Sequence, residues 1–106
     1  MIKASFFETN GRLKGFSVSG HANFADKGGD IVCAGVSSAV QMCVNAVTEI
    51  LKEPADVSVE ENKISLTLKN AGGPGEEFIE ALRLQIICLA EDYENTIELY
   101  VVKGKG

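Results

Sequence analysis

The chain has 106 residues, which is enough for one compact domain and too few for two. Hydrophobic residues make up 45% and charged residues 24%, and these values exclude the disordered, collagen-like and coiled-coil classes. The 15 acidic and 10 basic residues give a net charge of −5, whereas nucleic-acid-binding domains are normally basic. We therefore expect a single domain over residues 1–106 that does not bind nucleic acid directly.

The cellular compartment is indicated by hydropathy and by the cysteines. No apolar run approaches the roughly 20 residues of a membrane span, and the N-terminus lacks the pattern of a signal peptide. Three cysteines are an odd number, and their spacing is not that of a metal cluster. Such thiols are typical of a reducing compartment. We expect a cytoplasmic protein with no membrane contact.

The first elements form a hairpin. Ile2, Ala4 and Phe6 alternate with polar residues before Asn10-Gly11, the preferred centre of a two-residue type I′ turn. This pattern predicts strands over residues 2–9 and 13–20. Residues 21–30 follow neither the alternation of a strand nor the spacing of a helix, so they predict a loop. Helical spacing of apolar residues begins near Ile31.

That helix continues to about Leu51. Asp30 is a candidate N-cap, and Pro54 follows the C-terminal end. Two alternating segments around Glu61-Asn62 then predict a second hairpin. A glycine-rich turn separates it from a second helix that opens with Glu76 and ends near Asn95, and a last strand follows over residues 96–102.

The order ββαββαβ predicts an α+β fold. Two amphipathic helices bury their apolar stripes on one face of a five-stranded, mostly antiparallel sheet, and a mixed sheet with the same layers is the alternative. The last strand carries apolar residues on both faces at Tyr100-Val101-Val102. An open edge of this kind suits a homodimer.

The strongest candidate for chemistry is the segment from Ser19 to Gly35, which contains the only histidine, His21, and the cysteine Cys33. Cysteine and histidine are the partners of a thiolate–imidazolium pair. A cysteine in the first turn of a helix lies near unpaired N–H groups and the positive end of the dipole, which favour the thiolate. A chain of twelve residues can return His21 to contact with it.

Other residues of the segment have possible supporting roles. Backbone N–H groups at the helix start can receive an oxyanion, and Asp30 can either cap the helix or orient His21. Ser37 lies one helical turn after Cys33 on the same face. Gly28 and Gly29 would let the loop open and close over a bound peptide.

Each of these features also has a purely structural interpretation. Cys33 can be a core residue among apolar neighbours, and Cys43 and Cys88, on the helical stripes or beside them, are expected to pack in the core. His21 and Cys33 supply only two of the three or four ligands that zinc needs. The glycines at 72–75 lack the Lys-Ser/Thr of a phosphate-binding loop. We therefore expect no metal and no cofactor, and composition and spacing alone leave the function open.

The residue identities in the segment from Ser19 to Ala39 indicate a protein family more specifically than the spacing of His21 and Cys33 does. Ser19-Gly20-His21-Ala22, Gly29-Asp30-Ile31-Val32-Cys33-Ala34 and Val36-Ser37-Ser38-Ala39 closely resemble the ribosomal-processing cysteine protease Prp (YsxB-like) family. The resemblance extends over the whole chain. It implies a bacterial, cytosolic, homodimeric endopeptidase that removes the N-terminal extension of large-subunit ribosomal protein twenty-seven, cutting after a phenylalanine.

The resemblance also implies roles for single residues. His21 corresponds to the general base and Cys33 to the nucleophile, while Asp30 and Ser37 match positions that support the site. Lys27-Gly28-Gly29 differs from related loops, which often carry an acidic residue. Two alternatives stay open: a non-enzymatic ribosome-assembly or binding factor with the same fold, and a redox sensor, which lacks an evident resolving cysteine.

Overall fold

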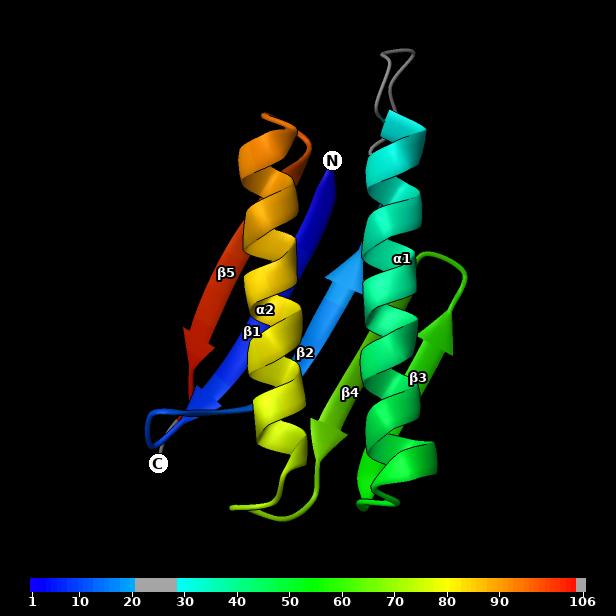
Figure 1. Ribbon diagram of the computed structural model, residues 1–106. Helices are drawn as coiled ribbons and strands as arrows, with labels where there is room; N and C mark the ends of the chain where they lie inside the picture. The colour runs from blue at the N-terminus through cyan, green and yellow to red at the C-terminus, as the bar shows by residue number, and fades with distance from the viewer. Residues whose placement is uncertain (21–28, 105–106) are drawn as a thin grey trace.

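The computed structural model describes residues 1–20 and 29–104 (Figure 1). Its elements follow the order ββαββαβ, with a short π-helical turn, η1, at the end of the first helix. The bounds are β1 Ile2–Thr9, β2 Arg12–Ser19, α1 Gly29–Asn45, η1 Ala46–Ile50, β3 Ala55–Glu60, β4 Lys63–Leu68, α2 Gly75–Asp92 and β5 Ile97–Lys103.

The five strands form one sheet in the order β3-β4-β2-β1-β5. Three of the neighbouring pairs are antiparallel, and β5 is parallel to β1. The predicted ββαββαβ order and the mostly antiparallel sheet are therefore confirmed, with one parallel pair at the edge. The parallel pair is a consequence of α2, which carries the chain back across the sheet before β5 begins.

The first hairpin turns at the predicted dipeptide. Asn10 and Gly11 have φ values of 54° and 78°, so both central residues take the positive φ of a type I′ turn. The pairing shifts by one residue between Phe7 and Glu8, which is a β-bulge. Because of this shift, Leu13 as well as Phe16 points into the core.

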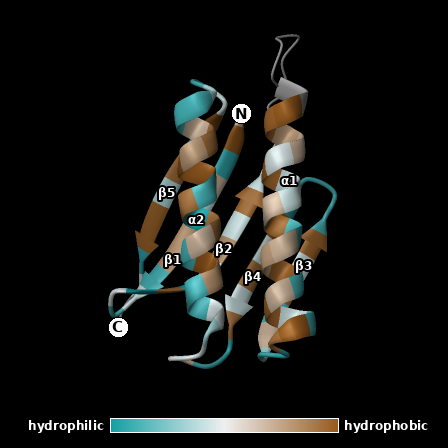
Figure 2. Cartoon of the chain, viewed as in Figure 1, coloured by the Kyte–Doolittle hydropathy of each residue, from teal (hydrophilic) through white to brown (hydrophobic). Residues whose placement is uncertain are grey.

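Both helices lie on the same face of the sheet (Figure 1). Figure 2 shows hydrophobic residues spaced between hydrophilic ones along the strands and along both helices, and the residues of the buried core come from both layers. Phe6 and Phe16 are fully buried at the centre, with their ring centroids 6.4 Å apart. The predicted layers are confirmed. The buried apolar residues of the helical segments are Val32, Val36, Val40, Cys43, Ala46, Val47, Ile79, Leu82 and Ile86.

Within the 20-residue stretch Ile31–Ile50 the mean hydropathy reaches 1.6 over 18 residues, so the stretch is long and apolar enough to cross a membrane. The expectation that no apolar run approaches this length is therefore wrong. Its buried stripe packs on the sheet, however, and this arrangement is that of the core helix of a globular domain. Length and composition alone do not separate the two cases, so this helix does not indicate a membrane protein.

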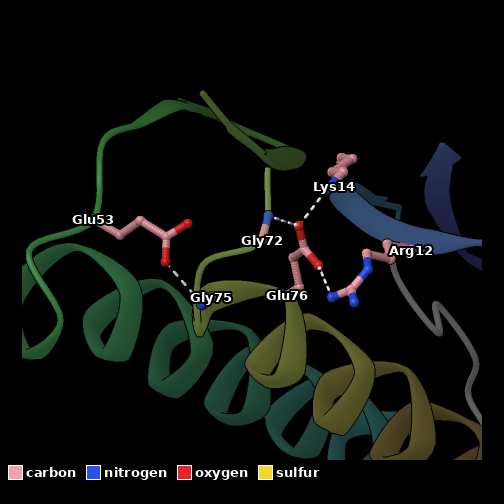
Figure 3. Close-up of polar contacts among 6 residues, drawn as sticks. All are labelled: Arg12, Lys14, Glu53, Gly72, Gly75 and Glu76. Atoms are coloured by element: carbon pink, nitrogen blue, oxygen red, sulfur yellow. Dashed lines mark hydrogen bonds and ion pairs between the residues drawn. The ribbon is translucent and has the colours of Figure 1, made fainter. Parts of the chain in front are cut away.

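Two carboxylates hold the start of α2 (Figure 3). Glu76 is 5% exposed, forms ion pairs with Arg12 and Lys14, and accepts a hydrogen bond from the Gly72 N–H at 2.7 Å. Burial alone would raise the pKa of Glu76, but the hydrogen bonds from Lys14, Gly72 and Arg12 outweigh it and lower the pKa to about 2. The sequence predicted an acid at this helix end, but not its burial.

Candidate active site

A cavity of about 140 Å³ lies between α1, the end of β2 and the turn that joins β3 to β4. Its walls combine apolar core side chains with polar residues of that turn. The side chains on its helical side come from Cys33, Val36, Ser37 and Val40. The opposite side is formed by Ile2, Val18, Gly20, Glu60, Glu61, Asn62, Lys63 and Ile64.

Cys33 and Ser37 lie on successive turns of α1 and face the same cavity, as their spacing predicted. Cys33 is half-buried and Ser37 is exposed. The buried neighbours Val36 and Val40 turn toward the sheet and fix the rotation of the helix. The core packing of α1 therefore fixes the direction of the Cys33 thiol, and the cavity leaves that thiol accessible to a bound molecule.

Gly20 brings the end of β2 to the same cavity. Its φ of +84° lies in the left-handed region, and a Cβ at this position would meet the Met1 carbonyl oxygen at 2.5 Å. Its N–H donates to the Asn62 carbonyl oxygen at 3.0 Å. The chain therefore leaves β2 in a direction that only glycine can adopt without strain, one residue before His21.

The remaining residues of the predicted site are only partly covered by the structure. His21 and Gly28 lie outside the described residues, and of Gly29 and Asp30 only the backbone is described, as the first two residues of α1. The N-cap prediction for Asp30 is wrong, because a cap at that position requires a helix that begins at Ile31, and α1 begins two residues earlier, at Gly29.

The earlier start of α1 also changes the position of Cys33. Cys33 is the fifth residue of the helix and not part of its first turn. The influence of the dipole falls off within that turn. The helix start therefore contributes less to the chemistry of this thiol than the sequence predicted.

The three cysteines have three different environments, and none of them forms a disulfide. Cys43 is 2% exposed and donates from Sγ to the Phe78 carbonyl oxygen at 3.6 Å, so its predicted core position is confirmed. Burial raises its pKa to about 11. The core prediction for Cys88 is wrong: this residue is exposed, because it lies beside the buried stripe of α2 and not on it.

No group of three or more histidine, cysteine or acidic side chains that could hold a metal ion occurs within the described part of the chain. What the described residues bring together is a partly open thiol, a hydroxyl one turn away and a cavity with an apolar floor. This arrangement suits a nucleophile that acts on a bound organic substrate.

Residues 1–98 match the family model described as cysteine protease Prp. The chain belongs to this family. Since its members are cysteine proteases, this Prp-family chain is a cysteine-type peptidase, and the resemblance drawn from the Gly-His-Ala and Asp-Ile-Val-Cys-Ala motifs is confirmed. The predicted alternatives of a binding factor and a redox sensor receive no support from this match.

Similar proteins agree with the family assignment. The ribosomal processing cysteine protease Prp of Staphylococcus aureus is 25% identical over 92 residues, which cover 84% of this chain and 87% of that protein. A crystal structure of SMU.848 from Streptococcus mutans has a TM-score of 0.85 and 26% identity, covering 98% of this chain and 96% of the other.

A crystal structure of Staphylococcus aureus Prp in complex with a covalently linked product peptide also has a TM-score of 0.85. At 22% identity, and with 95% of this chain and 99% of that chain covered, it shows that the two share a fold.

Sequence reasoning about the Prp-family site missed its β3–β4 side. The turn from Glu60 to Lys63 forms one wall of the cavity, although it lies 27 residues or more from Cys33 along the chain. Nothing in its local pattern distinguishes it from an ordinary hairpin turn. Only the pairing of β4 with β2 places it beside Gly20 and α1.

Proposed function

We propose that this protein is an endopeptidase in which Cys33 is the nucleophile and His21 is the general base. The observation that carries the proposal is that Cys33 and Gly20, the residue before His21, line one cavity. The two positions are 13 residues apart in sequence, so their meeting is a product of the fold. This supports a Cys-His pair, which is the usual chemistry of a cysteine peptidase.

The proposed reaction has two halves. The Cys33 thiolate attacks the scissile carbonyl carbon and forms a C–S bond, the C–N bond breaks, and His21 transfers its proton to the leaving amine. His21 then takes a proton from water as the water oxygen attacks the thioester carbon. The C–S bond breaks, the acid product leaves, and the thiolate is restored.

Neighbouring residues have supporting roles in this proposal. Ser37 is exposed at the cavity wall, where its hydroxyl can donate to a bound peptide carbonyl. Asp30 orients His21 as the acid of a triad does. N–H groups at the start of α1 receive the oxyanion, and Gly28 and Gly29 allow the preceding loop to move over the substrate.

The proposed substrate is the precursor of large-subunit ribosomal protein twenty-seven, cleaved after a phenylalanine at the end of its N-terminal extension. The Staphylococcus aureus relative is named as a ribosomal processing protease, which supports this class of substrate. The net charge of −5 favours approach of a basic ribosomal protein, an attraction that weakens with salt. No cofactor is required by the proposed reaction.

We further propose that the protein acts in the bacterial cytoplasm as a homodimer of single-domain chains. Free thiols suit that compartment. Tyr100 and Val102 are 45% and 47% exposed on the edge strand β5, which supports pairing with a second copy. Sedimentation of the wild-type protein and of Val102→Lys tests the dimer, which this change should weaken.

The decisive experiment is mass spectrometry of the extended precursor after incubation with the purified protein. We expect a single cut after the phenylalanine, and complete loss of the cut in Cys33→Ala and in His21→Ala. Cys88→Ala is the matched control, because it removes an exposed thiol that lies away from the cavity, and it should cut at the wild-type rate.

The outcomes separate the proposed roles. Full activity of Cys33→Ala would remove the nucleophile assignment. Binding of an uncut precursor by the wild-type protein would favour the assembly or binding factor. Unchanged turnover of Asp30→Asn would remove Asp30 from the site, because only a charged carboxylate can stabilise the imidazolium.

A further inference from the structure

Strand β3 has an apolar side that the helices do not cover. Val57 and Val59 lie directly opposite Leu66 and Ile64 of β4, so they share the helix-facing side of the sheet. Leu66 is fully buried, whereas Val57 is 39% and Val59 71% exposed. The apolar face of the sheet therefore continues past the cover of α1 at this edge.

The exposed valines begin at the rim of the Cys33 cavity. Ile64 lines that cavity, and Val59 is its direct neighbour across the strand pair, at the short Cβ separation of about 4.5–5.5 Å typical of such pairs. Glu60, the next residue after Val59, lines the cavity as well. The uncovered apolar side of β3 and the cavity thus form one continuous surface.

The backbone of β3 is also open on its outer side. Of the five described strands, β3 is the last in the sheet order on the side of β4 (Figure 1). An edge strand presents a row of N–H and C=O groups to which an extended peptide can add as a further strand. Strand β3 therefore has three features that suit an extended peptide substrate. It has an open edge, apolar side chains two residues apart and a thiol cavity at one end.

We propose that β3 is the docking strand for the substrate, which adds beside it in extended form with apolar side chains on Val57 and Val59. The proposal rests on the proposed role of Cys33 as nucleophile. The six residues of β3 correspond to roughly 20 Å of strand and thus to about six substrate residues. The scissile bond lies at the Glu60 end, next to the cavity.

A second copy of this chain is a poorer occupant of the same edge. If two β3 strands paired antiparallel about Ser58, Asp56 of each copy would lie opposite Glu60 of the other. Like charges directly opposite one another destabilise a strand pair. A basic substrate chain meets the same acids with attraction.

The protein-side test is the double variant Val57→Thr/Val59→Thr, which keeps the β-branched shape and replaces one methyl group of each valine with a polar hydroxyl. For a peptide long enough to reach both positions we expect KM to rise about tenfold with kcat unchanged. Ser58→Thr is the matched control on the opposite side of the same strand and should leave both constants unchanged.

The substrate-side test is a series of peptides that each carry one N-methyl group. In a strand added to β3, every second N–H points at β3, so methylation should raise KM at alternate residues only. A uniform effect, or equal KM values for the wild-type protein and the double variant, would overturn the docking strand. The docking strand would also be overturned if the two substitutions dissociated a dimer and left peptide cleavage unchanged.

The result also distinguishes this inference from the proposed function. Iodoacetamide should label Cys33 equally fast in the wild-type protein and in Val57→Thr/Val59→Thr, because the thiol is untouched. If wild-type cleavage does not depend on Cys33, the proposed function fails. If cleavage depends on Cys33 but not on the two valines, only the docking strand fails.

Discussion

The backbone N–H of Gly20 donates a hydrogen bond to the backbone carbonyl oxygen of Asn62 across 3.0 Å. This bond joins the end of β2 to the β3–β4 turn, and both residues line the cavity that contains Cys33. The backbone of Gly20, the residue before position 21, is therefore held in place by a main-chain hydrogen bond. A change in backbone direction at Gly20 would be transmitted directly to the proposed site.

Replacing Gly20 with alanine should lower both stability and activity. A Cβ at this position would lie 2.5 Å from the Met1 carbonyl oxygen, and the φ of +84° is strained for any L side chain. We expect the strained φ to lower the free energy of unfolding of Gly20→Ala, and the contact with Met1 to lower it by about 1–3 kcal/mol more. Urea unfolding measures the total loss. Its kcat should fall, because the chain direction before His21 changes.

The matched control is Gly11→Ala. Gly11 has a similar φ of +78°, but an added Cβ there would meet nothing within 4 Å. This variant should cost about 1–2 kcal/mol and leave kcat unchanged. Equal unfolding free energies for the two variants would show that the close contact with the Met1 carbonyl oxygen does not destabilise Gly20→Ala.

The three cysteines should differ in their reaction with iodoacetamide in the native protein at pH 8. Cys43 should stay unlabelled, because it is buried and its pKa is raised to about 11, so the thiolate is scarce. Cys88 should label because it is exposed to the reagent, and Cys33 should label fastest. Peptide mass spectrometry at successive times gives the three rates.

The labelling has an internal control in urea, where all three thiols should react alike. Loss of the fast phase in His21→Ala would support the pairing of His21 with Cys33. Rapid native labelling of Cys43 would contradict its burial, and equal slow labelling of Cys33 and Cys88 would argue against an activated nucleophile.

The sequence was informative where the signal was local. Asn10-Gly11 specifies its turn through the φ values that these two residues accept, and the helical stripe through Val36 and Val40 needs only a period of 3.6. The family motif located Cys33 because it is a continuous run of residues. Such features are encoded within a few neighbours and can be read without knowing the fold.

The errors arose where the outcome depends on distant partners. Glu76 is buried and paired with Lys14, 62 positions earlier, and no local pattern contains that pair. Cys88 looked apolar by spacing but lies just outside the contact between α2 and the sheet. The β3–β4 wall of the cavity depends on strand order, which periodicity does not determine.

The charge of Glu76 should make stability depend on acid pH. The pKa is lowered to about 2 in the folded protein, so the unfolded chain takes up this proton at higher pH than the folded chain does. The stabilisation is therefore complete above the ordinary carboxyl range and is lost as pH falls from about 5 toward 2. Urea unfolding at a series of pH values measures this slope.

Glu76→Gln should remove that slope and lower stability at pH 7 by about 1.5–3 kcal/mol, the range for hydrogen bonds to a charged group. Glu77→Gln is the matched control, since Glu77 is the next residue of the same turn and is exposed. An unchanged slope in Glu76→Gln would mean that other carboxyl groups cause the acid sensitivity.

Glu53, in the segment between η1 and β3, should stabilise the start of α2. Its Oε1 accepts a hydrogen bond from the Gly75 N–H at 2.8 Å, so a carboxylate from another segment satisfies a free N–H of α2 (Figure 3). Glu53→Ala should cost about 1 kcal/mol, like the loss of an N-cap. Glu53→Gln keeps the acceptor but loses the charge at the helix N-terminus, so its stability should fall between those of the wild type and Glu53→Ala. Urea unfolding of the three proteins gives the order, and equal stability of Glu53→Ala and the wild type would show that this contact does not hold the helix.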